Sequence, residues 1–263
     1  MEPPWEKGPE RIEQLLGART EARELLVFYQ SLLVFQKSLF ALLEEAEPSG
    51  SFTRDLPRLM NSFVGFLNGI AVNGSTLLRS QAQEMKYWEA DRQAGLLAAY
   101  WRHEEIPGGN FFPKAFLQPY ATHLAQHGIA IQDRDDSRAG CPFCGAPPQL
   151  SFLQSPPSIA GIGSEGAGRR LLCSLCFSDW PINRICCANC SEANPDQLSY
   201  FQSERLPAMR IEACDSCLRY LKGVNLTKDG LAVPLVDELA TPALDIWARE
   251  NGYQKIELNL AGI

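Results

Sequence analysis

Long apolar runs are absent from this 263-residue sequence. It contains no uninterrupted stretch of about 18 apolar residues, the length needed to cross a bilayer. The first residues, MEPPWEKGPERIEQLL, also lack the apolar core of a secretory signal peptide. We therefore expect a cytoplasmic protein without membrane insertion, in which cysteines stay reduced.

A basic excess is absent as well, since the formal net charge is -7. Proteins that bind nucleic acids usually carry clustered lysines and arginines that contact phosphate. The acidic balance therefore favours protein partners over DNA or RNA.

Catalytic motifs are lacking too. There is no G-x-S-x-G nucleophile motif and no glycine-rich phosphate loop. The three histidines, His103, His123 and His127, all lie apart from the cysteines in sequence and so are not expected to activate a thiol. His123 and His127 share one face of a predicted helix and could hold a metal, but without a nearby acidic or cysteine partner we interpret them as surface imidazoles. We expect no catalytic residues, no organic cofactor and no enzyme activity.

In contrast to these absences, the sequence is rich in cysteine, with nine residues. Eight of the nine form four CxxC pairs: Cys141/Cys144, Cys173/Cys176, Cys187/Cys190 and Cys214/Cys217. A CxxC step on a tight turn, called a knuckle, directs two thiolates at one point, and two knuckles complete a four-sulfur site for zinc or iron. The alternative, a disulfide scaffold, belongs to oxidising compartments. The spacing therefore predicts two metal ions, iron or zinc, each bound by four cysteines.

The gaps between the pairs predict how the knuckles combine. Gaps of 28 and 23 residues follow Cys144 and Cys190, whereas 10 residues follow Cys176. A gap above about 20 residues can hold a β-hairpin that returns the chain to its start, as in zinc ribbons. We pair the first knuckle with the second and the third with the fourth. Cys186 is then a spare thiol, interpreted as a small buried side chain rather than a reactive one.

Apolar periodicity predicts helices before the cysteines. The clearest is Thr20–Glu47, and four or five helices are expected over residues 1–130. Another is expected from about Leu56, and its predicted apolar face consists of Leu59, Phe63, Phe66, Leu67 and Ile70. The predicted fold is multidomain, α plus small β, with a helical domain (1–130), a linker (131–140), a first rubredoxin-like ribbon (141–183) and a second ribbon with a C-terminal helix (184–263).

The residues around the knuckles resemble those of the FdhE family. The similarity is carried by GRRLLCSLC (168–176), RICCANC (184–190), EACDSC (212–217) and DELATPALD (237–245). It covers about 110 residues well and the helical half only loosely. One departure is Ser191, where the family usually has glycine after the third knuckle; another is Asp237-Glu238, where paired aspartates are expected.

The resemblance implies a cytoplasmic accessory protein that binds the catalytic subunit of a formate dehydrogenase during its maturation. It also implies a helical domain joined to two rubredoxin-like ribbons. One alternative is a rubredoxin-like protein for electron transfer or redox sensing, since four-thiolate iron can exchange an electron and zinc cannot. A nucleic-acid-binding zinc-ribbon protein is the less favoured alternative. A homo-oligomer is compatible with any of these functions.

Overall fold

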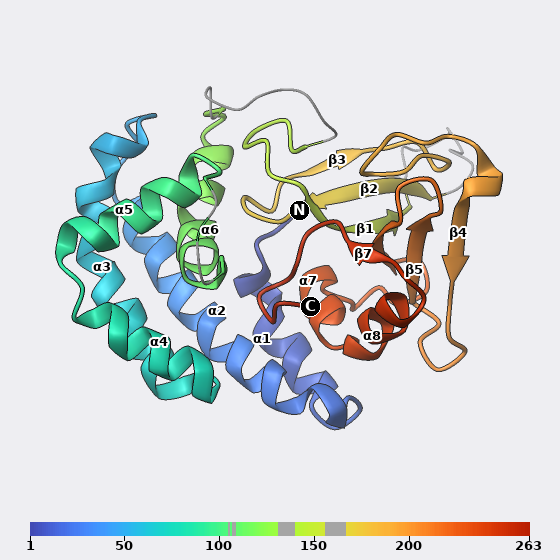
Figure 1. Cartoon of the computed structure of the whole chain (residues 1–263), viewed down its shortest axis with the longest axis horizontal. Coiled ribbons are helices and arrows are strands. Elements are labelled where there is room, and N and C mark those ends of the chain that lie inside the picture. Colours follow the sequence, from blue (N-terminus) through green and yellow to red (C-terminus); the bar gives the residue numbers. More distant parts are fainter. Residues whose placement is uncertain (105, 107–108, 131–139, 156–166) are drawn as a thin grey trace.

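A computed structural model describes the chain except for residues 105, 107–108, 131–139 and 156–166. Helices occupy one side of the molecule and a twisted sheet occupies the other (Figure 1). The linker predicted at 131–140 lies almost wholly outside the described residues.

Six α-helices and one short 3-10 helix are described before the sheet, rather than four or five helices. They are α1 (Pro4–Leu15), η1 (Thr20–Ala22), α2 (Arg23–Glu44), α3 (Phe52–Asn73), α4 (Thr76–Lys86), α5 (Ala90–Trp101) and α6 (Phe111–Gln126). The apolar pattern of the sequence predicts a further helical run over Ser75–His103, but the structure splits it into α4 and α5 by a turn at residues 87–89. Ser75 caps α4 by accepting a hydrogen bond from the backbone N–H of Leu78.

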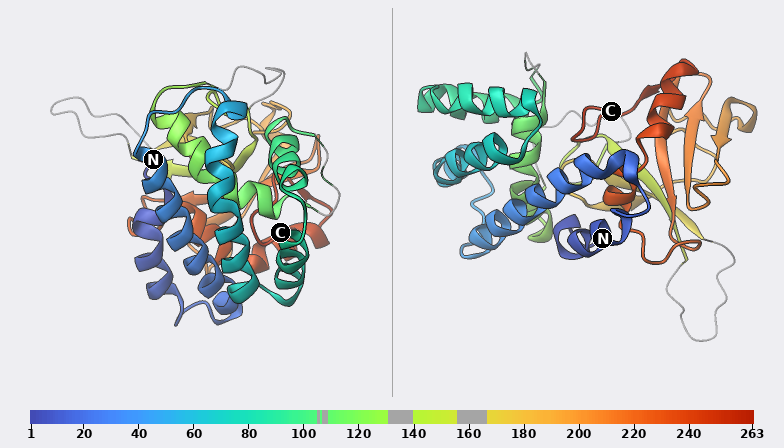
Figure 2. Two further views of the ribbon diagram at one scale, coloured as in Figure 1. Left: turned by 90° about the vertical axis from the view of Figure 1, so that its left-hand side faces the viewer. Right: turned by 90° about the horizontal axis from the view of Figure 1, so that it is seen from below.

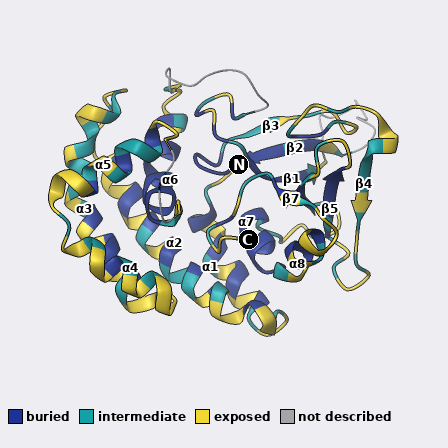
Figure 3. Cartoon of the chain, in the orientation of Figure 1, coloured by how far each residue is buried: buried dark blue, intermediate teal, exposed yellow. Residues whose placement is uncertain are grey.

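The helical core forms where amphipathic faces meet. The apolar face predicted for α3 is confirmed, since Leu59, Phe63, Phe66, Leu67 and Ile70 are all buried. Phe63 packs edge-on against Phe116 of α6, with ring centroids 4.9 Å apart. Helix α6 is buried along most of its length because the helices cover it on one side and the sheet on the other (Figures 1 and 3).

One segment, Thr20–Glu44, is long and apolar enough to span a membrane by length and composition. Within its most apolar window, 39% of the residues are buried in the structure. Leu26, Leu33 and Phe40 of this helix face the core, as expected for the central helix of a bundle.

The described strands form one mixed sheet. They are β1 (Pro148–Gln154), β2 (Gly168–Cys173), β3 (Asp179–Pro181), β4 (Leu198–Phe201), β5 (Met209–Cys214), β6 (Arg219–Asn225) and β7 (Gln254–Lys255). The order is β3-β2-β1-β6-β5-β4, with β7 beside β6. Strands β1, β2 and β3 form one antiparallel ribbon, and β4, β5 and β6 form a second. The first strand of the first ribbon lies beside the last strand of the second.

The two predicted ribbons are fused through a parallel pair. Leu150 of β1 lies opposite Lys222 of β6, and the pairing continues to Leu153 opposite Asn225. A continuous backbone ladder therefore connects regions that we predicted as tandem domains. The individual domain boundaries remain predictions.

Two short helices, α7 (Pro234–Leu239) and α8 (Pro242–Glu250), follow the sheet. The sequence predicts a single helix from Val236 to Arg249, but Pro242 begins a second one because proline fits the first turn of a helix and disrupts an interior. Helix α7 packs between α1 and strands β1 and β6, as Figure 2 shows from two further directions. It thus connects the helical half to the sheet.

Candidate metal centres

The first four-cysteine group combines the first two predicted knuckles. Cys141 lies 3.5 Å from Cys176, and Cys144 lies 3.3 Å from Cys173, measured between Sγ atoms. All four side chains are buried, with exposed fractions of 4% or less. Strand β2 runs directly into the second knuckle, and β1 begins soon after the first, so the β1–β2 pairing brings the two knuckles together.

The second group combines the third and fourth knuckles in the same way. The Sγ atoms of Cys187 and Cys217 are 3.8 Å apart, and those of Cys190 and Cys214 are 3.7 Å apart. Here Cys190 is exposed and Cys217 is half-buried. The structure thus gathers the eight cysteines into the two predicted sets.

Each knuckle is followed by a residue in the left-handed backbone region. These residues are Gly145 (φ 66°), Phe177 (φ 56°), Ser191 (φ 63°) and Leu218 (φ 54°). This conformation turns the chain sharply after the second cysteine, and it is easy only for glycine. The repeated geometry shows that all four CxxC steps form the same kind of turn.

The spacing of the sulfurs fits a four-coordinate metal. In each group, the four Sγ atoms lie within 4.8 Å of one another. A tetrahedron with metal–sulfur bonds of about 2.3 Å has edges of about 3.8 Å. All nine cysteines are free, and the Sγ separations are well beyond the roughly 2.05 Å of a disulfide. Both groups are therefore positioned to bind metal ions.

The electrostatic environment of the cysteines also favours a bound cation. Burial raises the pKa of the Cys173 thiol well above its usual value, and it also raises the pKa of Cys187. Several buried thiolates close together need a compensating positive charge to stay ionised. A divalent or trivalent cation supplies that charge, and metal binding would release protons from these thiols.

Cys186 lies outside both groups. Its side chain is half-buried, and its thiol donates to the backbone oxygen of Cys187 at 3.6 Å. The three arginines near the knuckles contact carboxylates and backbone oxygens, including the carbonyl of Cys186, to which Arg169 donates at 2.7 Å. Arg169 pairs with Glu212 at 2.6 Å, Arg170 pairs with Asp179, and Arg184 donates to the backbone oxygen of Ala167.

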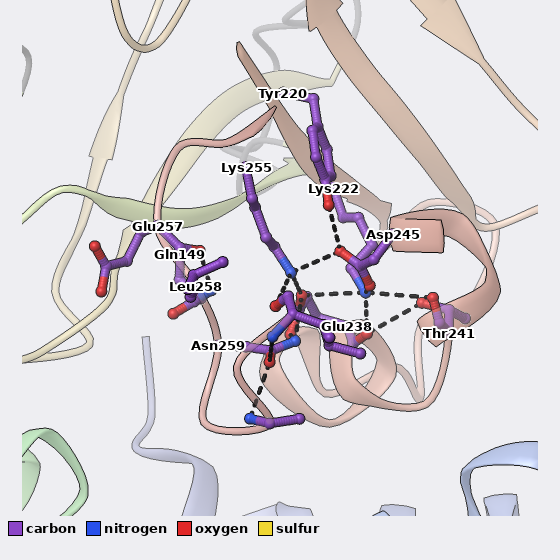
Figure 4. Close-up of polar contacts among 12 residues, drawn as sticks. Gln149, Tyr220, Lys222, Glu238, Thr241, Asp245, Lys255, Glu257, Leu258 and Asn259 are labelled. Atoms are coloured by element: carbon purple, nitrogen blue, oxygen red, sulfur yellow. Dashed lines mark hydrogen bonds and ion pairs between the residues drawn. The ribbon is translucent and has the colours of Figure 1, made fainter. Parts of the chain in front are cut away.

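A buried ionic network lies between the sheet and helices α7 and α8 (Figure 4). Lys222 of β6 and Lys255 of β7 both contact Glu238 of α7 and Asp245 of α8, and all four side chains are at most 5% exposed. Tyr220 donates to Asp245 at 2.9 Å. Burial disfavours the charged form of Asp245, yet the two lysines hold its pKa below the usual value.

This network was missed by sequence reasoning, which treats charged residues on a helix as solvated by default. A signal was present, because Asp237, Glu238 and Asp245 lie in helical segments rich in apolar residues. Asp237 is also buried, and it accepts from Arg11 of α1 at 2.6 Å. The acidic segment is therefore an internal anchor rather than a solvated face.

The prediction of surface imidazoles was wrong for His123. His123 is 1% exposed, packs edge-on against Phe40, and has no hydrogen-bond partner for either ring nitrogen among the described residues. His127 is exposed, with its ring centroid 4.4 Å from that of His123. Helix α2 covers this end of α6 through Phe40, and helical periodicity alone could not indicate this contact between helices.

Comparison with known proteins identifies similar chains. The family model described as "FdhE, C-terminal domain" matches residues 185–261. The protein named "Protein FdhE homolog" from Aquifex aeolicus is 31% identical over 209 residues, which cover 79% of this chain and 71% of that protein. A homolog from Pseudomonas aeruginosa is 38% identical over 131 residues, covering 48% of this chain and 40% of that one.

A solved structure shares the fold. The crystal structure of the FdhE protein from Pseudomonas aeruginosa superimposes with a TM-score of 0.70 at 24% identity, covering 97% of this chain and 94% of that one. The helical half, the sheet and the C-terminal helices thus form an architecture that exists in a second protein.

Proposed function

The chain belongs to the FdhE family, and from this membership we propose that it is a cytoplasmic accessory protein for the maturation of formate dehydrogenase. In this proposal it binds the catalytic subunit of that enzyme and performs no substrate turnover of its own. The observation that carries the proposal is the combination of family membership over both halves of the chain with two four-cysteine groups.

We infer that each group holds one metal ion, iron or zinc. The ligands would be Cys141, Cys144, Cys173 and Cys176 in the first site and Cys187, Cys190, Cys214 and Cys217 in the second. When bound, the metal supplies positive charge and crosslinks two knuckles, which stabilises small ribbons. Four protein sulfurs complete a tetrahedral shell, so such a site leaves no position for a substrate or water. This closed ligand set supports a binding role.

Client binding can be tested by co-purification. The tagged chain and the catalytic subunit of formate dehydrogenase are produced together, and the subunit is expected to be retained on the tag. Cys144→Ser should lose metal from the first site and weaken retention, because the first ribbon loses its crosslink. Cys186→Ser is the matched control and should keep both metals and the client. Failure of the fully metal-loaded chain to retain the subunit would contradict the proposal.

A redox role is the second candidate, favoured by the solvent exposure of residue Cys190. A four-thiolate iron site near the surface can exchange one electron with a partner, whereas zinc cannot. The chain should be purified without oxygen and its metals measured by plasma emission, alongside a visible spectrum. Two iron atoms with thiolate charge-transfer bands would support a redox role in preparing the client. Two zinc atoms and no colour would eliminate it.

A further inference from the structure

We propose that the two cysteine groups have different roles. The first is a structural site whose metal stays bound and which connects the helices to the sheet, and the second is a site whose metal can be exchanged. Its exchange partners would be soft ligands, such as the cysteine thiolates of another protein. This inference rests on the metal ligation proposed above but does not depend on the identity of the client.

The first group is held by the helical half. The side-chain amide of Gln118 on α6 donates to the backbone oxygen of Ser174 at 3.0 Å. The hydroxyl of Thr122, which donates to the backbone oxygen of Gln118 at 2.7 Å, lies 3.4 Å from the backbone oxygen of Cys176. The carbonyls of Ser174 and Cys176 belong to the second knuckle. Phe177, immediately after it, packs edge-on against Trp5 of α1, with ring centroids 5.8 Å apart. All four cysteines of this group are buried, and the second knuckle is held by α6 and α1, so an attacking ligand reaches these sulfurs only after local opening of the structure.

The second group belongs to the other ribbon, and it lies at the same edge of the sheet as the first, because the parallel strands β1 and β6 both begin just after a knuckle. Strand β4, in the ribbon that carries the second group, is at the right-hand edge of Figure 1, and helices α3 to α5 are at the left-hand edge. Ile185 and Leu218 next to its knuckles are 51% and 55% exposed. Cys190 is exposed and Cys217 is half-buried, so two of the four cysteines in this group are open to solvent, whereas all four of the first group are buried.

Ligand exchange at this group needs no oxidant or reductant. With a metal bound, an incoming thiolate would replace Cys190 as a ligand, and the released Cys190 thiolate would take a proton from water. Repeating the step at Cys217 leaves the metal with two external and two internal sulfurs. Because Cys187 and Cys214 are buried, they would leave last.

The test uses the full-length chain loaded with zinc, which is redox-silent. Excess 4-(2-pyridylazo)resorcinol is added and the coloured zinc complex is followed over time. We expect a fast phase of one zinc per chain and a slow phase of one more. Opening free energies differ across a protein, and a difference of about 1.4 kcal/mol already separates the two rates about tenfold.

Alkylation identifies which group has opened. After the fast phase, iodoacetamide is added and the labelled cysteines are located by mass spectrometry. Labelling is expected at Cys187, Cys190, Cys214 and Cys217, and protection at the first group. Cys186 is expected to be labelled whether or not the chelator is present, so it serves as an internal reference.

Two variants separate the phases. Cys190→Ser should abolish the fast phase while the helical circular dichroism and the slow zinc remain. Gln118→Ala removes a contact to the first group without touching a ligand, so it should accelerate the slow phase by several-fold and leave the fast phase unchanged. Gln93→Ala, which removes a side-chain contact inside the helical half, is the control and should change neither.

Several outcomes would overturn the inference: release of both metals in one phase, labelling of the first group before the second, or a chain that holds no metal. The last would also remove the metal assignment. Two-phase release by a chain that fails to retain the catalytic subunit would leave this inference standing and reject only the proposed client.

Discussion

At the scale of a single residue, His123 makes the free energy of unfolding depend on pH. Burial, as the main cause, lowers its pKa; His127 and Arg58 add to the shift, while Glu44 and the backbone of Ala46 oppose it. The folded state therefore binds its proton less readily than the unfolded state, whose histidine pKa is about 6.5. Its stabilising contribution is present above that value and is lost as the pH falls below it.

We predict that His123→Phe flattens the decline of unfolding free energy between about pH 7.5 and 5.5, since the titrating group is gone. Chemical denaturation at a series of pH values measures the slope. The exposed His127→Gln is the control and should leave most of the slope in place. An unchanged slope in His123→Phe would show that another group is responsible.

Ser191 occupies a conformation that suits glycine. Its φ of 63° is unfavourable for a residue with a Cβ atom, and the side chain is exposed, so nothing is lost by removing it. Ser191→Gly should stabilise the chain by about 0.5–1 kcal/mol. Ala193→Gly, two residues away and without a positive φ, should be neutral or slightly destabilising. Thermal denaturation of the metal-loaded proteins measures both, and equal effects would contradict the strain argument.

At the scale of elements, Lys222 attaches helices α7 and α8 to strand β6. Its ammonium group contacts Asp245 and donates to the backbone oxygens of Glu238 at 2.5 Å and Thr241 at 3.3 Å. Replacing it with methionine keeps the volume but leaves buried acceptors and an excess of buried negative charge. We expect Lys222→Met to cost about 3–5 kcal/mol of unfolding free energy.

The measurement is equilibrium denaturation, with the exposed Lys228→Met as a matched control that should change stability by less than about 0.5 kcal/mol. A second readout is hydrogen exchange, in which β7 and the segment after α8 should lose protection first. If Lys222→Met proved as stable as the unmodified chain, the network would have no anchoring role.

At the scale of the whole molecule, the halves are coupled at several points. Arg11 of α1 pairs with Asp237 of α7 and with Asp229, and Lys114 of α6 pairs with Glu257 at 2.6 Å. The β1–β6 ladder connects the two ribbons. We therefore predict that the helical half and the first metal site unfold together.

Coincident transitions in helical circular dichroism and in release of the slow zinc, followed across a denaturant series, would confirm this coupling. Arg11→Met should shift both curves together to lower denaturant, because it leaves Asp237 buried without its partner. A helical transition that precedes zinc release by a clear interval would instead show that the halves are independent.

The sequence by itself determined the features that depend on residues close together in the chain. The CxxC steps specified four turns, and the gap lengths specified which turns meet, because a hairpin needs enough residues to return to its start. The apolar face of α3 followed from a 3.6-residue period. The residues around the knuckles also sufficed to indicate the family, which the relative from Aquifex aeolicus confirms.

Only the tertiary structure decided what covers each element. The pairing of β1 with β6, the burial of Lys222 and Asp245, and the enclosure of His123 all involve contacts between residues far apart in the chain. The unequal exposure of the two cysteine groups has the same origin. Their sequence spacings are alike, but α1 and α6 cover one group and solvent reaches the other, because burial is set by the packing of whole elements.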